Sequence, residues 1–437
     1  MNNPVGIRRE DKNRFEARVP ITPRDLKDLI EKTGARFIVQ PSEIRVFSDE
    51  EYKKAGAEIS EDISSCRLIF AVKEIPIDYF YKNHTYMFFS HTIKGQPYNM
   101  PMLKKMMELK CNLIDYEKVT DDQNRRLIFF GKYAGLAGMI DSLWALGKKF
   151  QAEGIETPFE GIEHAYRYSK LKDAENAISR VGEIIKENGI PLQLRPLITG
   201  FAGYGNVSRG AQEIYDLLPT EEISPDNIEK LFEEPENHKY KLYKVVFKEE
   251  DMVEPINPAD NFELRDYYDH PEKYRSKFSK YLPYLTMLIN CIYWDTMYPR
   301  LLTKEFAKKL YIEEQNPRLR VIGDISCDIE GAIELTVKST EPDAPVYLYD
   351  IEREIAVDGF VGNGPIIMAV DNLPCELPKE ASEEFSRALK PFIPAIINAD
   401  FSKPFEEIDI PDEIKRAMIL HKGELTPNFK FMEKFVQ

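Results

Sequence analysis

The chain has 437 residues, a formal net charge of −15 and 43% hydrophobic residues, which is enough for two domains or one large discontinuous pair. The acidic charge makes nucleic acid and anionic membranes poor partners. No apolar run approaches the roughly 18 to 20 residues of a membrane span, and the first nine residues lack the apolar core of a signal peptide. We therefore expect a soluble, intracellular protein, with the cytoplasm favoured.

The five cysteines are scattered along the chain and contain no C-x-x-C pair: Cys66, Cys111, Cys291, Cys327 and Cys375. Such spacing indicates neither a zinc site nor a disulfide framework. We expect buried thiols and no metal.

The first 135 residues alternate strand-like and helix-like segments, as in an α/β domain. A strand is expected over 5–8. The next segment, 22–31, has a Thr suited to the N-cap and Pro at the first helical position, and Gly34 is placed to end that helix. Further buried strands are expected over three segments: 36–40, 68–72 and 86–89.

Two groups able to carry a proton follow the last two of these strands. Lys73 comes directly after one and His91 after the other. Each residue taken alone is more typical of a solvated loop. Together, at one edge of neighbouring strands, they supply an amine and an imidazole that burial can tune toward neutral pH. In open parallel sheets this edge is where ligands bind.

A long helix is expected over 131–148, with small residues at Gly131, Gly135 and Gly138. This spacing favours close packing against another element over ligand contact. We place a domain boundary near this helix.

A glycine loop lies near the middle of the chain. An apolar strand around 197–202 leads into Gly203-x-Gly205, and a helix is expected over 210–218, closed by Pro219. Gly203 would form a tight turn, and Gly205 would let backbone amides approach a pyrophosphate at the helix N-terminus. Ser208 stands where a third glycine is usual. A bare loop is the alternative to a cofactor site.

The polar, tyrosine-rich segment from about 221 to 284 shows no clear periodicity, and we interpret it as an insertion, a lid or a surface loop. Buried strands then follow over 285–293, ending near Asn290, and over 319–324. Asp324 and Asp328 lie at or beyond the second strand and could bind ribose or position a nicotinamide, or act as structural caps.

Seven segments, in order along the chain, resemble the lysine-ketoglutarate reductase domain that forms the first half of bifunctional aminoadipic semialdehyde synthase in animals and plants: 8–23, 72–74, 88–94, 115–117, 205–212, 290–294 and 371–382. The resemblance runs from about residue 4 to the C-terminus. By pattern, the chain also resembles the lysine-forming saccharopine dehydrogenase of fungi and, more distantly, alanine dehydrogenase and the soluble part of transhydrogenase.

The resemblance implies an α/β fold with two Rossmann-like domains, parallel sheets and a cleft between them. A substrate domain would comprise 1–135 plus 372–437, so that the C-terminal segment completes it. A dinucleotide-binding domain would comprise 136–371, with the insertion at about 221–284.

The activity implied is an oxidoreductase of lysine metabolism that condenses L-lysine with 2-oxoglutarate to saccharopine, or runs the reverse, using a reduced nicotinamide cofactor. Lys73 and His91 match the family's catalytic lysine and histidine. We assign Lys73 as the base that takes the proton from the substrate amine and His91 as the acid and base for the carbinolamine oxygen. These two roles are a hypothesis.

The family pattern also assigns binding residues. Arg18, Lys94 and Arg126 match cations for the substrate carboxylates, although Arg125 could replace Arg126, and Glu117 matches an acid near the substrate amine. The cofactor set is Gly203, Gly205, Asn206, Val207, Ser208, Asn290, Asp324 and Asp328. Glu221, Glu222 and Lys230 do not decide the cofactor. The length of the 221–284 segment favours NADP(H), with NAD(H) possible.

Two alternatives stay open. One is an alanine-dehydrogenase-like amino-acid dehydrogenase, against which the segment 371–382 and the insertion argue. The other is a dinucleotide-binding partner of a membrane transhydrogenase, or a sensor without turnover. A homo-oligomer is possible in each case.

Overall fold

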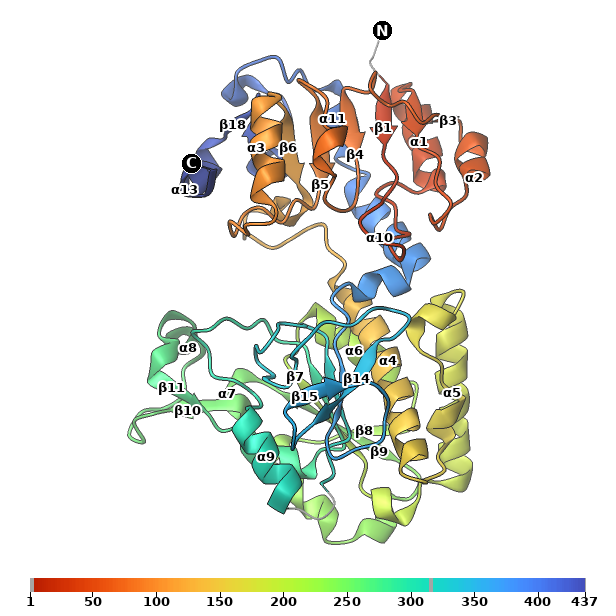
Figure 1. Ribbon diagram of the computed structural model, residues 1–437, viewed down its shortest axis with the longest axis vertical. Helices are drawn as coiled ribbons and strands as arrows, with labels where there is room; N and C mark the ends of the chain where they lie inside the picture. The colour runs from red at the N-terminus through yellow and green to blue at the C-terminus, as the bar shows by residue number, and fades with distance from the viewer. Residues whose placement is uncertain (1–3, 314–316, 437) are drawn as a thin grey trace. The chain divides into compact units, whose positions relative to one another are not determined.

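The computed structural model describes residues 4–313 and 317–436. Its contacts divide the chain into two units (Figure 1). The first runs to Phe130 and resumes at Pro378, and the second is Gly131–Leu377. The sequence places the boundaries after residues 135 and 371. The assignment of one unit to substrate and the other to dinucleotide stays a prediction.

The first unit is built on an eight-stranded sheet with strand order β18-β17-β6-β5-β4-β1-β2-β3. Its strands are β1 (Val5–Ile7), β2 (Phe37–Val39), β3 (Glu58–Ile59), β4 (Leu68–Phe70), β5 (Thr85–Phe88), β6 (Asn112–Asp115), β17 (Met418–His421) and β18 (Glu424–Leu425). The first six pair in parallel, but β17 pairs antiparallel with β6 and β18 antiparallel with β17. The C-terminal segment, blue in Figure 1, therefore completes this sheet, and the expected parallel sheet is mixed at that edge.

The helices of this unit are α1 (Pro23–Thr33), α2 (Asp49–Lys54), α3 (Met100–Glu108), α10 (Pro378–Leu389), α11 (Ile393–Asn398), α12 (Asp412–Arg416) and α13 (Glu433–Val436). Helix α1 has the termini that its sequence predicts. The side chain of Thr22 accepts a hydrogen bond from the Asp25 amide at 3.3 Å, Pro23 opens the helix, and Gly34 ends it at a φ of 66°.

The second unit contains a sheet with strand order β15-β14-β16-β13-β12-β7-β9-β8. Its strands are β7 (Ile198–Ala202), β8 (Thr220–Glu222), β9 (Leu242–Phe247), β12 (Met287–Asn290), β13 (Val321–Asp324), β14 (Val346–Asp350), β15 (Ile355–Val357) and β16 (Ile366–Met368). All pairs are parallel except those of β14 with β16 and with β15. This sheet too is mixed at one edge rather than wholly parallel.

The described α-helices of this unit are α4 (Gly131–Ala152), α5 (Leu171–Asn188), α6 (Asn206–Tyr215), α7 (Glu249–Met252), α8 (Leu264–Asp269) and α9 (Lys304–Glu313). The unit also has a small antiparallel pair, β10 (Val253–Pro255) and β11 (Tyr274–Ser276), and several short 3-10 helices.

Two sequence interpretations in this unit are wrong. Helix α6 begins at Asn206, not at 210, because Gly205 is its N-cap; Ser208 is thus already in the first helical turn. The segment 221–284 is not wholly an insertion, since β9 lies inside it and pairs with β7 along five residues.

The small residues of α4 allow close helix packing, as the spacing predicts. A Cβ added at Gly135 would fall inside contact distance of the Val207 carbonyl oxygen of α6, and one at Gly210 would collide with the carbonyl of Lys132. Glycine at both positions therefore lets the two backbones approach. At Gly138 the neighbours are the side chains of Ile325 and Leu373.

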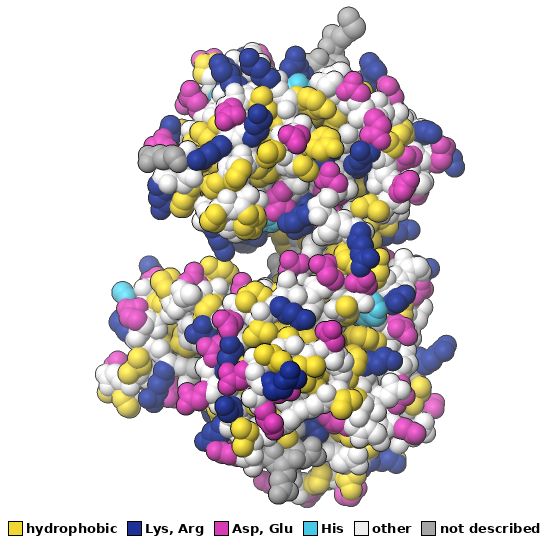
Figure 2. Space-filling model, in the orientation of Figure 1, with side chains coloured by type: hydrophobic (Ala, Val, Ile, Leu, Met, Phe, Trp, Pro, Cys, Tyr) yellow, Lys and Arg dark blue, Asp and Glu magenta, His cyan; other side chains and the backbone are white. Residues whose placement is uncertain are grey.

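All five cysteines are free thiols, and Cys291 and Cys327 are half-buried rather than buried. Over the described ranges, no helix combines the length and hydropathy that a membrane crossing requires. On the face drawn in Figure 2, Lys and Arg side chains are interspersed with Asp and Glu.

Candidate active site

Lys73 and His91 follow neighbouring parallel strands of the first unit. Strands β4 and β5 are in register at Phe70 and Met87, and the Phe89 amide continues the ladder by donating to the Val72 carbonyl at 3.0 Å. The residues that follow the two strands therefore lie at the same edge of the sheet. This is the carboxyl edge, where the sequence predicts proton-transfer groups.

Glu74 contacts both His91 and Lys12 at this edge of the sheet. Its Oε1 lies 2.7 Å from Nδ1 of His91, and its two oxygens accept hydrogen bonds from Nζ of Lys12 at 3.0 and 2.9 Å. Burial opposes ionisation of Glu74, but the contacts with His91 and Lys12 dominate and lower its pKa to about 2. An ionised carboxylate accepts only, so Nδ1 of His91 carries hydrogen and Nε2 is the nitrogen that exchanges a proton.

The backbone at His91 is constrained, with a φ of 48°, and its carbonyl accepts a hydrogen bond from Nδ2 of Asn99 at 3.1 Å. The ring stacks on Phe89 with centroids 6.1 Å apart. About 31% of the side chain stays exposed. The imidazole is thus held in place while one face stays accessible.

Lys73 is half-buried, and in the described part of the chain its ammonium has no hydrogen bond or ion pair. Burial lowers its pKa, and the nearby Arg18 adds to this effect. The backbone beneath it is fixed, because Glu10 accepts hydrogen bonds from the amides of Val72 at 2.7 Å and Lys73 at 2.9 Å. A neutral amine is therefore more accessible here than on an ordinary lysine.

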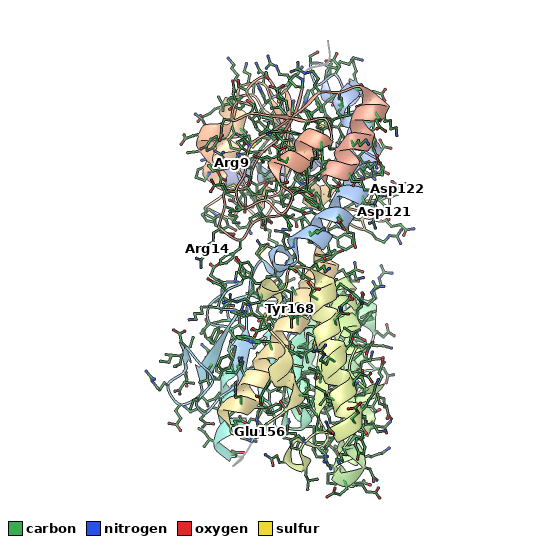
Figure 3. The ribbon with its side chains drawn as sticks, turned by 90° about the vertical axis from the view of Figure 1, so that its right-hand side faces the viewer. Arg9, Arg14, Asp121, Asp122, Glu156 and Tyr168 are labelled. Carbon is green, nitrogen blue, oxygen red and sulfur yellow. The ribbon has the colours of Figure 1, made fainter. Side chains whose placement is uncertain are left out.

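A buried acid–base cluster adjoins Lys73 in the segment after β1, which Figure 3 marks with Arg9 and Arg14. Glu16 pairs with Arg18 through Oε1 to Nε at 2.7 Å and Oε2 to Nη2 at 2.5 Å, and both side chains are at most 1% exposed. Burial, with Glu16 nearby, raises the pKa of Glu10 to about 7. The Nε–Nη2 edge of Arg18 is therefore occupied by a protein carboxylate.

The other predicted substrate residues lie on neighbouring loops of this unit. Glu117, in the turn after β6, forms an ion pair with Arg126. Its amide is held by Asp115, a buried carboxyl whose pKa is raised by burial. Lys94 is exposed in the turn after β5, and Arg125 pairs with Asp121 rather than with Glu117.

The glycine loop follows β7 at the carboxyl edge of the second sheet. Gly203 has a φ of 93°, which favours glycine, and its amide donates to the Phe247 carbonyl at the end of β9. Gly205 is the N-cap of α6, and a Cβ built there meets no atom within 4 Å. Gly205 and Asn206 are exposed and Val207 is half-buried, so the first amides of α6 border open space.

Three of the predicted cofactor residues have buried side chains instead. Asp324 accepts from Nδ2 of Asn290 at 2.8 Å and from Oγ1 of Thr336 at 2.5 Å, and burial raises its pKa to about 6. Ser208 is fully buried and accepts from Nε2 of Gln212 at 2.9 Å. These side chains brace the strand ends and helix, whereas Asp328 is exposed.

Sequence reasoning missed several residues. Glu74 and Lys12 lie within two segments that carry the resemblance, 72–74 and 8–23, but neither residue is assigned a role from the sequence. Lys248 and Glu249 follow β9, the strand next to β7, and this position reads the ribose in dinucleotide-binding sheets. Lys248 is exposed, and Glu249 accepts from the Tyr268 hydroxyl at 2.6 Å. Glu221 and Glu222 lie in β8 and Lys230 lies in the turn 229–232, so none of them follows β9 directly.

Among the described residues, no three His, Cys, Asp or Glu side chains gather so that they could hold a metal ion.

The fold and the N-terminal region indicate the structural class of this protein. Residues 6–137 match the family described as the alanine dehydrogenase/PNT N-terminal domain. A solved L-alanine dehydrogenase superposes with a TM-score of 0.62 at 16% identity, covering 99% of this chain and all of that one. The chain therefore has the fold of an alanine dehydrogenase, with two Rossmann-like sheets.

Other relatives have higher sequence identity to this chain than the solved alanine dehydrogenase has. Alpha-aminoadipic semialdehyde synthase of Arabidopsis thaliana is 38% identical over 448 residues, which cover 99% of this chain and 41% of that protein. The lysine-forming NAD(+) saccharopine dehydrogenase of Candida albicans is 27% identical over 410 residues, covering 89% and 91%. The chain spans less than half the length of the aminoadipic semialdehyde synthases it matches. The resemblance stated from the motifs is thereby confirmed.

Proposed function

We propose that this chain catalyses the reductive condensation of L-lysine with 2-oxoglutarate to saccharopine, with NADPH as the favoured reductant. The observation that carries the proposal is the juxtaposition of Lys73, Glu74 and His91 at one sheet edge. Support also comes from similarity to aminoadipic semialdehyde synthase over nearly the whole chain and to saccharopine dehydrogenase.

The glycine loop fits a dinucleotide. Gly203 has the φ that the turn requires, and Gly205 leaves the helix N-terminus open to a pyrophosphate. The bound nicotinamide would supply the hydride that reduces the imine. Gly203 would shape the turn, and Gly205, Asn206 and Val207 would hold the cofactor through backbone amides. Ser208, Asn290 and Asp324 would act indirectly by bracing this edge.

The proton transfers fall to the first unit. The substrate ε-amine must lose a proton before it attacks the ketone, and Lys73, whose pKa is lowered, is suited to accept it. Loss of water from the carbinolamine needs a proton at its oxygen, which Nε2 of His91 can give. Glu74 holds Nδ1 and supplies the counter-charge when the ring is protonated.

The substrates carry three carboxylates, for which we propose Arg18, Lys94 and Arg126. The guanidinium groups of Arg18 and Arg126 already pair with Glu16 and Glu117. A substrate carboxylate would therefore join or displace these pairs, which favours binding of doubly charged 2-oxoglutarate over a neutral ketone. Glu117, once released from Arg126, could meet the substrate ammonium.

The proposed activity is tested by following NADPH absorbance with lysine alone, 2-oxoglutarate alone, both together, and pyruvate with ammonia. We expect oxidation only when lysine and 2-oxoglutarate are both present. Oxidation with pyruvate and ammonia would instead favour an alanine dehydrogenase, and no oxidation in any arm would contradict the proposal.

Besides the length of the 221–284 segment, the preference for NADP is supported by Lys248, an exposed cation directly after β9. A 2′-phosphate would pair with it, whereas NAD(H) has none. Replacing Lys248 by Gln should raise the KM for NADPH about tenfold and change that for NADH less than twofold. Equal effects on both cofactors would contradict this assignment. The cytoplasmic location and a homo-oligomer stay predictions.

A further inference from the structure

A polar cavity of about 440 Å³ lies in the second unit at the opposite end of the sheet from the glycine loop. Its walls are the segments that lead into β7, β13 and β16, and the last turn of α4. Glu156, labelled in Figure 3, marks the chain just beyond that end of α4. Because the glycine loop follows the carboxyl end of β7, this amino-edge cavity is separate from the proposed cofactor site.

Three cations gather at the cavity. Lys149 and Arg320 line it, and Arg318 lines an adjoining pocket of about 30 Å³ that shares Arg320 and Gln193. The side chains of Lys149 and Arg320 are only 5% and 10% exposed. Such burial of cations is costly unless negative charge compensates it.

Glu153 supplies one such charge. Its Oε2 lies 3.1 Å from Nε of Arg320, and its Oε1 lies 3.6 Å from Nζ of Lys149. Among the described residues that line the two spaces, it is the sole carboxylate. Among these described lining residues, three cations therefore accompany one carboxylate.

Backbone carbonyls explain part of this arrangement. Nζ of Lys149 donates to the Phe360 and Gly362 carbonyls at 3.1 and 3.2 Å. Nη2 of Arg318 donates to the carbonyls of Leu194 and Pro196 at 3.0 and 2.5 Å. These bonds orient the cations but carry no formal charge.

Arg318 has a hydrogen-bond donor that these carbonyls do not satisfy. Burial, with Arg320 close by, lowers its pKa to about 10. Its Nε is buried and, within the described ranges, has no hydrogen-bond partner. A buried donor of this kind is uncommon in a native protein, and an acceptor in the adjoining space would satisfy it.

We propose that this cavity binds a small, multiply charged anion through carboxylate or phosphate oxygens. The cations would neutralise it, and the amides of Gln193 and Asn363 on the exposed rim would add neutral hydrogen bonds. The site is not one of those that the proposed reaction uses, so it fits an effector rather than a substrate.

Calorimetric titration of the full chain, with NADPH saturating, tests this site. The probes are inorganic phosphate and, separately, succinate, which distinguish phosphate from carboxylate recognition. Gln193 is exposed, so its substitution spares the core. We expect Q193E to weaken binding at least threefold and Q193K to strengthen it by a similar factor, because the added charge sits at the rim.

R275Q is the matched control. Arg275 is an exposed cation paired with Glu254 on the small β10–β11 pair, and its loss should leave the affinity unchanged. Opposite effects of the two Gln193 variants, for either probe, support the site. Absence of binding by both probes, or binding that neither Gln193 variant alters, would overturn it. The measurement needs no turnover, so it does not depend on the proposed activity.

Discussion

At the residue scale, the proposed chemistry depends on Glu74 as much as on the two groups that exchange protons. Its carboxylate fixes which nitrogen of His91 carries hydrogen and connects that ring to Lys12. Lys73 contributes through burial beside Arg18, which weakens the hold of its amine on a proton. Each role makes its own prediction.

Replacing Glu74 by Gln should lower kcat about 10- to 100-fold and change the pH dependence of kcat, because His91 loses its counter-charge and its fixed tautomer. Steady-state kinetics from pH 6 to 9 would measure both effects. The control is K12Q, which removes the other partner of Glu74 but keeps the bond to His91; we expect less than a threefold loss. Equal losses in the two variants would mean that Glu74 acts structurally.

Replacing Lys73 by Met should lower kcat at least about 100-fold while NADPH binding is retained, since the amine that accepts the substrate proton is gone. In the wild type, activity should rise with pH as Lys73 deprotonates, below the range of an ordinary lysine. K82M, at an exposed loop lysine, is the control and should be neutral. A K73M enzyme within twofold of wild type would refute the assignment.

At the element scale, the two glycines of the glycine loop have different roles: Gly203 is required by the backbone conformation, and Gly205 leaves space for a ligand. G203A should lower the free energy of unfolding by about 1 to 3 kcal/mol, because φ is 93° and the new Cβ would lie 3.0 Å from Ile292. G205A should cost less than about 1 kcal/mol, since φ is −74° and the space is open, yet weaken NADPH binding at least tenfold.

Denaturant unfolding and a fluorescence titration with NADPH measure the two effects. If G205A bound NADPH as the wild type does, the open space at this N-cap would not be a phosphate site.

Helix α4 also carries a buried carboxyl, Asp141, whose pKa burial raises to about 7. Its pKa is coupled to that of Glu376, a second buried carboxyl in the turn 373–376, whose pKa is raised by burial and by Asp141 itself. No cation is among the groups that shift either carboxyl; the other contacts are the amides of Ala165 and Tyr166. The pair therefore holds protons that the unfolded chain releases.

Both carboxyls have a higher pKa in the folded state than in the unfolded chain, where it is near 4. Their contribution to stability is therefore complete below about pH 4 and is lost as the pH rises toward 7. The free energy of unfolding should therefore fall across this range in the wild type. In D141N the fall should be smaller by roughly 1 to 3 kcal/mol. Urea unfolding at pH 4.5, 6 and 7.5 measures it, and identical slopes in both proteins would exclude the pair as the cause.

Local rules predicted the elements that local interactions define. Helix α1 has its Thr22 cap, its Pro23 start and its Gly34 stop because each acts within one turn. Strand β9 was missed because Lys244 interrupts its apolar pattern; the structure buries that lysine by pairing it with Asp216 of the turn after α6. The contact between Glu74 and His91 likewise depends on the register of β4 and β5, which no local pattern reveals.

At the scale of the whole molecule, the chain leaves the first sheet after β6 and returns to it only at β17. Composition and periodicity do not predict this return; resemblance to the reductase family implied it, and the pairing of β17 with β6 gives it a structural basis. The antiparallel edges of both sheets were not expected, since they depend on the path of the returning segments.

The proposed reaction needs groups from both units: proton transfer from the first and a bound dinucleotide in the second. The most direct test is to incubate the chain with lysine, 2-oxoglutarate and NADPH carrying two deuterium atoms at C4, and to weigh the product by mass spectrometry. We predict saccharopine that contains one deuterium. Saccharopine without the label, or no saccharopine at all, would contradict this account.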